Sequence, residues 1–129
     1  MSKPGKTGIG RVIDAFGYSM KGFAACWRFE AAFRQEVVLG LILLPVAFWL
    51  AQTHLELILL IMTIFIVWMA ELANSSVEAV VDRTGHEKHE LSGRAKDIGS
   101  ALVFTSLVML GLVWGIITLH RFVPGLLPG

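Results

Sequence analysis

The fold is decided by the stretch Trp68-Met69-Ala70-Glu71-Leu72-Ala73-Asn74-Ser75-Ser76-Val77-Glu78-Ala79-Val80-Val81-Asp82-Arg83, in which carboxylates follow a long apolar run. Steps of three, four and seven residues return to the same face of a helix. One helical stripe therefore carries the polar residues Glu71, Asn74, Glu78 and Asp82. A charge within hydrocarbon costs on the order of 3 kcal/mol, so such residues usually face a protein interior or a water-filled site. Glu71 is the first functional candidate, and the alternative is that Glu71 and Asn74 only hydrogen-bond between helices.

The composition indicates a small membrane protein. The chain has 129 residues, of which 55% are hydrophobic, and its mean hydropathy is +0.69. This is too apolar for a soluble domain of this length, so we expect a single membrane domain over residues 1–129 and no nucleic-acid partner.

The distribution of the basic residues predicts the topology. All lysine and arginine residues except Arg121 fall in two segments, one near the N-terminus and one around residues 83–96. The positive-inside rule places both segments in the cytoplasm. We therefore expect the N-terminus and the 84–97 loop to be cytoplasmic, and the C-terminus to lie on the opposite side of the membrane.

Hydrophobic periodicity predicts an all-α fold. Residues 1–8 favour a mobile basic tail, and residues 9–28 favour an amphipathic surface helix that lies in the membrane interface. Three transmembrane helices are expected at about residues 31–51, 55–83 and 93–122. Pro45 falls inside the first of these, where a kink without a break is expected.

Several local signals refine these boundaries. Residues 52–54 are expected to form a turn, and Gly85 is a plausible C-cap of the second span. Ser92 or Gly93 could cap the third span. Arg94 and Lys96 would then lie beside its N-terminal amides, as in an anion site, although a topology signal alone explains these cations equally well.

Two further patterns are weak. His86 and His89 have a spacing of three that can suit a metal, but two histidines in a polar loop are poor support for a metal site. The glycines of the GxxxG pattern at residues 111–115 would permit close helix approach, although this pattern is common in apolar helices.

These residues alone leave two function classes nearly equal. Three short spans shield Glu71 from lipid poorly, so we expect oligomerisation. The sequence contains no nucleotide-binding P-loop, kinase glycine-rich loop or GxSxG elbow. A membrane enzyme and a small proton-coupled transporter, with Glu71 alternating between proton and substrate, both fit an acidic site near the cytoplasmic interface.

A resemblance favours the enzyme. The segments Glu-Ala-Ala-Phe-Arg-Gln-Glu at residues 30–36, Glu71 to Arg83, and His-Glu-Leu-Ser-Gly-Arg-Ala-Lys-Asp at residues 89–97 resemble the signature segments of the small prokaryotic diacylglycerol kinase family. The resemblance implies a homotrimer with shared sites, whose protomers each have a surface helix and three spans. It also implies ATP-dependent phosphorylation of diacylglycerol to phosphatidic acid. A related branch of the family phosphorylates undecaprenol, which remains an alternative.

The resemblance also implies roles for individual residues. Glu71 would be the general base, Asn74 would orient Glu71 or the lipid, and Mg²⁺ bound to ATP would be held by Glu30 and Glu78. The residues implied to contact nucleotide are Arg11, Tyr18, Glu30, Glu78, Glu87, His89, Lys96 and Asp97. The residues implied to contact the lipid are Arg11, Ala15, Ser19, Trp27, Ala32, Glu36, Glu71 and Ser100.

Overall fold

The computed structural model describes residues 5, 7–85, 87 and 89–129, and every regular element in these residues is an α-helix. The helices are α1 (Ile9–Phe29), α2 (Ala31–Leu50), α3 (His54–Thr84) and α4 (Glu90–Phe122). Helices α2, α3 and α4 are long and apolar enough to cross a membrane. The prediction of an all-α fold with three candidate spans is thereby confirmed. Most of the expected mobile tail at residues 1–8 lies outside the described residues.

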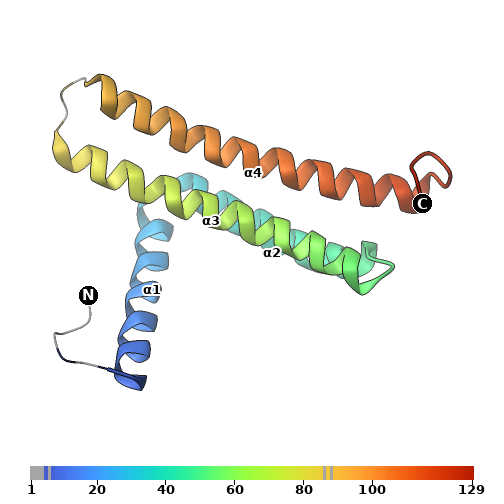
Figure 1. Cartoon of the computed structure of the whole chain (residues 1–129), viewed down its shortest axis with the longest axis horizontal. Coiled ribbons are helices and arrows are strands. Elements are labelled where there is room, and N and C mark those ends of the chain that lie inside the picture. The colour runs from blue at the N-terminus through green and yellow to red at the C-terminus, as the bar shows by residue number, and fades with distance from the viewer. Residues whose placement is uncertain (1–4, 6, 86, 88) are drawn as a thin grey trace.

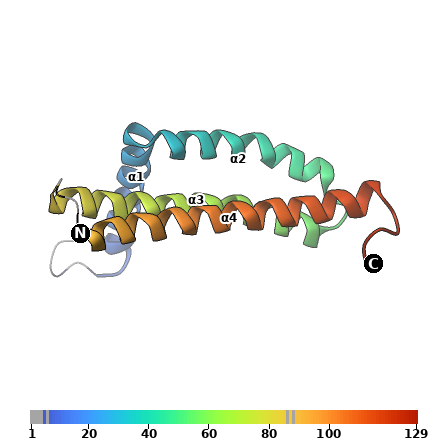
Figure 2. The same ribbon diagram turned by 90° about the horizontal axis from the view of Figure 1, so that it is seen from above.

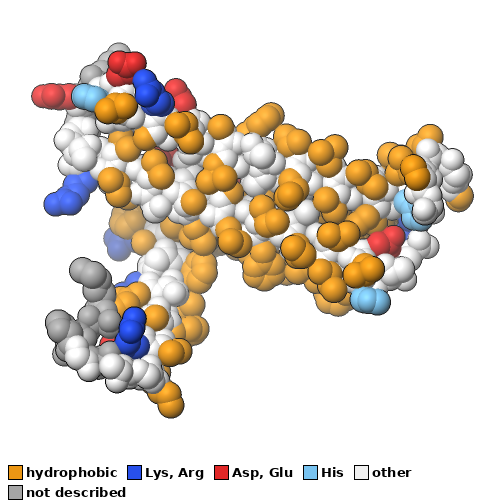
Figure 3. Space-filling view, in the orientation of Figure 1, with side chains coloured by type: hydrophobic (Ala, Val, Ile, Leu, Met, Phe, Trp, Pro, Cys, Tyr) orange, Lys and Arg blue, Asp and Glu red, His pale blue; other side chains and the backbone are white. Residues whose placement is uncertain are grey.

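The three long helices lie side by side, and α3 packs against both α2 and α4. Helix α1 projects away from them near the end where α2 begins (Figure 1). Hydrophobic side chains cover the length of the long helices in Figure 3, while charged side chains gather at the two ends. This distribution suits a surface that lipid surrounds, because the hydrocarbon core tolerates few exposed charges.

The corner between α1 and α2 is fixed by Arg34. Glu30 adopts an extended conformation with φ −117° and ψ 105°, which ends α1 and starts α2. Arg34 Nη1 donates to the carbonyls of Trp27 at 2.7 Å and Arg28 at 3.2 Å. These are carbonyls of the last turn of α1, which have no partner within the helix. Arg34 therefore sets the direction in which α1 leaves the helix bundle.

Helix α2 continues through Pro45 without a break. Figure 2 shows its last turns bending toward α3. At this end, Arg121 of α4 donates to the carbonyls of Trp49 and Leu50, and its guanidinium lies 4.7 Å from the Trp49 ring centroid. Arg121 thus supplies hydrogen-bond donors to carbonyls at the C-terminus of α2, which have no partner within that helix.

The connection between α2 and α3 comprises residues 51–53, one residue earlier than the turn predicted at residues 52–54. Helix α3 already begins at His54, because Thr53 is its N-cap and its hydroxyl accepts a hydrogen bond from Glu56 N at 3.2 Å. The Glu56 carboxylate in turn accepts from Gln52 N at 2.6 Å. These reciprocal bonds resemble a capping box. The difference is that the carboxylate accepts from Gln52, one residue before the N-cap, and not from the N-cap residue itself.

The loop between α3 and α4 confirms one predicted cap and corrects another. Gly85, with φ 138°, is the C-cap of α3, as predicted. The prediction of Ser92 or Gly93 as the cap of α4 is wrong. His89 is the N-cap, and its Nδ1 accepts from Leu91 N at 3.1 Å. Gly93 N already bonds to the His89 carbonyl at 3.0 Å, so Gly93 lies inside the helix.

The close helix approaches occur at glycines other than the predicted pair. A Cβ built on Gly111 or Gly115 meets nothing within 4 Å among the described residues. A Cβ on Gly40 of α2 would lie 2.8 Å from Ile64 Cγ2 and would also collide with the Trp68 ring, and one on Gly99 of α4 would collide with Asn74 Oδ1. Within this chain, helix α3 therefore approaches its neighbours most tightly at Gly40 and Gly99.

Candidate functional site

Glu71 is buried inside the helix bundle, with 3% of its surface exposed. Its carboxyl group lies within hydrogen-bonding reach of Glu36 on α2, and it also interacts electrostatically with Glu78 and Glu30. Glu71 therefore interacts with three other carboxyl groups, and these four glutamates, Glu30, Glu36, Glu71 and Glu78, are called the carboxyl cluster. Such a concentration of like charge is unfavourable without a cation, a proton or a ligand, so it identifies a candidate reaction site.

The position of Glu36 depends on Trp68. Trp68 Nε1 donates to the Glu36 backbone carbonyl at 2.9 Å, and its ring packs against Gly40 one helical turn further along α2. These contacts fix α2 against α3 at the level of the carboxyl cluster. Neither contact is visible in the sequence, because the two residues are separated by 32 positions.

Asn74 links the acidic stripe to α4. Its Nδ2 donates to Glu78 Oε1 at 3.5 Å, along its own helix. Its Oδ1 is buried, has no hydrogen-bond partner within the described part of the chain, and lies against Gly99. Within the described part of the chain, Asn74 therefore contacts α4 without a hydrogen bond to it.

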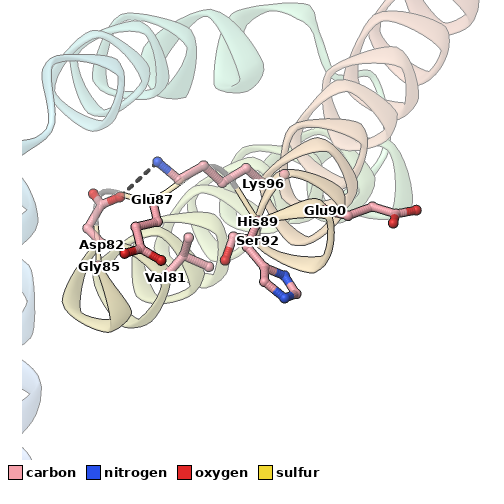
Figure 4. Close-up of a pocket in the computed structure, with 9 residues that line it drawn as sticks. Val81, Asp82, Gly85, Glu87, His89, Glu90, Ser92 and Lys96 are labelled. Atoms are coloured by element: carbon pink, nitrogen blue, oxygen red, sulfur yellow. Dashed lines mark ion pairs between the residues drawn. The ribbon is translucent and has the colours of Figure 1, made fainter.

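The acidic stripe ends at a polar cavity between the end of α3 and the start of α4, with a volume of about 500 Å³ (Figure 4). Glu87, His89 and Lys96 line this cavity together with Asp82. Lys96 Nζ lies 2.8 Å from Asp82 Oδ1. The cavity thus brings together three residues implied to contact nucleotide and the last carboxylate of the stripe.

The predicted anion site at the start of α4 does not form as expected. The helix begins three residues earlier than Gly93, and both cations have carboxylate partners. Arg94 pairs with Glu90 at 3.3 Å, and Lys96 pairs with Asp82. The cavity is therefore lined by both acidic and basic side chains, and not by cations alone.

The other predicted residues lie apart from this cavity. Asp97 and Ser100 are exposed on α4, Trp27 and Ala32 are exposed near the corner of α1 and α2, and neither pair lines the cavity. The α1 residues with implied contacts are also exposed and outside it, namely Arg11, Ala15, Tyr18 and Ser19. Figure 1 shows α1 extending away from the α3–α4 loop. One chain alone therefore does not gather the α1 residues at the carboxyl cluster.

The carboxyl cluster has the donor chemistry that Mg²⁺ prefers. Carboxylate oxygens are hard ligands, and Mg²⁺ is often held by one or two carboxylates plus substrate phosphates. Glu30 and Glu78 are both partly buried and both act on Glu71. The described residues contain no cluster of three or more His, Cys, Asp or Glu side chains placed as metal ligands, and His86 of the weak histidine pair lies outside the described residues.

Sequence reasoning missed Ser75 and Gly99. Ser75 follows Glu71 by one helical turn, so its spacing is a signal in the sequence, but a single serine in an apolar helix does not by itself indicate a site. Gly99 gave no signal of its own, because its importance comes from Asn74 across the helix interface.

Taken together, the fold and site define a small helical membrane protein with a carboxyl cluster next to a polar cavity. Residues 17–118 match the family described as prokaryotic diacylglycerol kinase. The chain belongs to this family, and the prediction that it is a kinase of this family, in a bacterial membrane, is confirmed.

Individual relatives match nearly from end to end. The diacylglycerol kinase of Haemophilus influenzae is 50% identical over 109 residues, which cover 84% of this chain and 92% of the relative. That of Escherichia coli K12 is 47% identical over 116 residues, covering 90% and 95%. That of Pseudomonas aeruginosa is 46% identical over 115 residues, covering 89% and 94%.

Proposed function

We propose that this protein transfers the γ-phosphoryl group of ATP to the free hydroxyl of diacylglycerol, forming phosphatidic acid and ADP at the cytoplasmic face of the inner membrane. The observation that carries the proposal is the buried Glu71 at one end of an acidic stripe whose other end reaches the polar cavity. A lipid alcohol and a water-soluble nucleotide enter from different media, and this stripe joins an apolar helix interior to an aqueous opening.

Glu71 acts as the general base. The lipid hydroxyl oxygen forms a bond to the γ-phosphorus, the bond from that phosphorus to the ADP oxygen breaks, and the hydroxyl proton passes to the Glu71 carboxylate. Asn74 and Glu36 position the reacting groups. Asn74 presents a buried amide oxygen with no partner in the described chain, and Glu36 contacts Glu71 directly.

The polar cavity receives the nucleotide. His89 and Lys96 present groups that can contact phosphates, and Glu87 lines the same wall. The Lys96–Asp82 pair is largely exposed, with side-chain exposures of 44% and 60%, and water screens such pairs so that they contribute little to stability. Lys96 is therefore free to exchange Asp82 for a phosphate at little cost.

Glu30 and Glu78 would hold Mg²⁺, and the ion would supply neutralisation of phosphate charge that Lys96 alone does not balance. The two glutamates lie on different elements, since Glu30 forms the corner between α1 and α2 and Glu78 belongs to α3. Mg²⁺ binding would thus tie the corner to the acidic stripe.

The active unit is a homotrimer with shared sites, in which α1 lies in the membrane interface. Exposed apolar residues Ile9, Val12, Ile13 and Phe16 on α1 support the interfacial placement. The separation of Arg11 and Tyr18 from the cavity of their own chain supports sharing, because contact with a nucleotide would then occur at a neighbouring chain's cavity. In the proposed topology, the N-terminus and the 84–97 loop are cytoplasmic and the C-terminus is periplasmic.

The test is transfer of labelled phosphate from γ-labelled ATP into defined lipids by the purified protein in mixed micelles. We expect label in phosphatidic acid with wild-type protein, none with Glu71→Gln, and near-normal label with Glu56→Gln, a matched change at the opposite end of α3. Label only in undecaprenyl phosphate would assign the chain to the other branch of the family. No transfer to either lipid, with proton-coupled uptake in vesicles, would favour the transporter.

A further inference from the structure

Ser75 is a buried hydroxyl group with no partner in the described part of the chain. Its residue is 6% exposed, and its Oγ makes no hydrogen bond. Serine in the middle of a helix usually bonds to a carbonyl three or four residues earlier. The neighbouring Ser76 does so, donating to the Ala73 carbonyl at 2.7 Å. A buried polar group left without a partner is unfavourable, because it loses its hydrogen bonds to water and gains none in return.

The Ser75 side chain lines a groove between α1 and α3. This groove has a volume of about 440 Å³ and is walled mainly by small or apolar side chains, including Gly22, Ala25, Leu72 and Ala79. Glu30 also lines it, and Glu30 acts electrostatically on Glu71. The walls of the groove are therefore mainly apolar, and Glu30 is the member of the carboxyl cluster that lines it.

Helix geometry places Ser75 between the groove and the acidic stripe. Successive residues of a helix are rotated by about 100° about its axis. Viewed down the axis, Ser75 therefore lies between Glu71, about 40° to one side, and Leu72, about 60° to the other side. It lies about 6 Å from Glu71 along the helix axis, at 1.5 Å per residue. A ligand whose reacting hydroxyl meets Glu71 would thus place atoms a few bonds away beside Ser75.

We propose that Ser75 is a specificity-determining residue that donates its Oγ–H to an ester carbonyl of the lipid substrate. This inference rests on the proposed function. In diacylglycerol, ester carbonyls lie a few bonds from the free hydroxyl, and they only accept hydrogen bonds. The groove supplies apolar walls for the chain that follows the ester, and Ser75 supplies the donor. The protein would therefore select ester-linked over ether-linked glycerolipids, because an ether leaves the buried hydroxyl unpaired.

The experiment compares 1,2-diacylglycerol with its 1,2-dialkyl ether analogue, which has the same hydroxyl and chains but lacks both carbonyls. The measurement is kcat/KM for each lipid, with ATP saturating, in mixed micelles of purified full-length protein. For wild-type protein we expect an ester-to-ether ratio of about ten, as one neutral hydrogen bond near 1.4 kcal/mol would give.

Ser75→Ala is expected to reduce this ratio to about one by lowering kcat/KM for the ester. Ser76→Ala is the matched control, because its hydroxyl is already bonded within α3, and it should retain the wild-type ratio. Ser75→Cys replaces the hydroxyl with a somewhat larger thiol that is a weaker donor, and should also lower the ratio. It provides the same test if the alanine variant folds poorly.

Two results would overturn the inference. A wild-type ratio near one would show that no ester carbonyl is recognised. An equal loss for both lipids in Ser75→Ala and Ser75→Cys would show that Ser75 serves packing, or that a neighbouring chain fills the groove. Failure of the proposed function is distinguishable from both, because wild-type protein would then phosphorylate neither glycerolipid.

Discussion

Trp68 of α3 donates its indole N–H to the backbone carbonyl of Glu36 on α2, at 2.9 Å. This bond joins the two helices at the residue whose carboxyl group meets Glu71. A second indole in the protein makes a comparable bond elsewhere, from Trp114 Nε1 to Thr63 Oγ1 at 3.0 Å. The two indole hydrogen bonds can therefore be compared, since the Trp68 bond lies near the carboxyl cluster and the Trp114 bond lies away from it.

We expect Trp68→Phe to lower both stability and activity, and Trp114→Phe to lower stability alone. Loss of one such hydrogen bond costs about 0.5–1.5 kcal/mol, and only at Trp68 does it also release the backbone that positions Glu36. The measurement is phosphoryl transfer at a temperature where both variants remain folded, alongside thermal unfolding in detergent. Equal activity losses in the two variants would contradict the positioning role.

Gly99→Ala is expected to reduce activity strongly, because the new Cβ would collide with the Asn74 amide oxygen. Relief requires either rotation of Asn74 or separation of α3 from α4. Gly111→Ala and Gly115→Ala are the controls. No described residue lies near their built Cβ atoms, and alanine stabilises a helix by up to about 1 kcal/mol relative to glycine. Activity and unfolding of all three variants decide the question, and a Gly99→Ala enzyme with normal turnover would refute the prediction.

Glu30→Ala and Glu78→Ala should each raise the magnesium concentration needed for half-maximal activity. Removing one oxygen ligand weakens a site that already relies on few protein groups. Activity is measured against free Mg²⁺ at fixed ATP, with Glu56→Ala as a control carboxylate at the other end of α3. If both variants give the wild-type curve, these glutamates do not hold the ion.

The sequence predicted the helices well, because their signals are local. The apolar runs, Gly85 at the end of α3 and Pro45 within α2 could all be interpreted from nearby residues. The stripe from Glu71 to Asp82 follows from helical periodicity alone. Contacts between distant residues could not be derived this way.

The errors arose where side-chain geometry outweighs composition. A histidine ring nitrogen caps α4 in place of the serine or glycine that statistics favour. Likewise, the glycine pair at residues 111–115 matches a packing motif, yet the tight contact within the chain occurs at Gly99. Whether a glycine permits a close helix contact depends on the residue that faces it on the neighbouring helix, and the sequence of one helix does not reveal that residue.

Sharing of sites between protomers gives the last prediction. Glu36 and Glu71 belong to one cluster within one chain, whereas Arg11 is exposed on α1, outside the cavity and outside that cluster. If a neighbour supplies Arg11, mixed trimers of Glu71→Gln and Arg11→Ala protomers contain some sites with both residues intact. We expect little activity from either variant alone, and mixing the two should therefore restore part of the wild-type activity.

The matched control mixes Glu71→Gln with Glu36→Gln. Both defects then fall in the part of the site that one chain supplies, so every site carries one of them and no activity should return. Crosslinking confirms that the protomers have co-assembled in both mixtures. Recovery in the first mixture alone identifies α1 as the element that crosses to a neighbouring site. No recovery in either mixture would mean that each chain completes its own site, and that α1 must move toward the carboxyl cluster of the same chain during turnover.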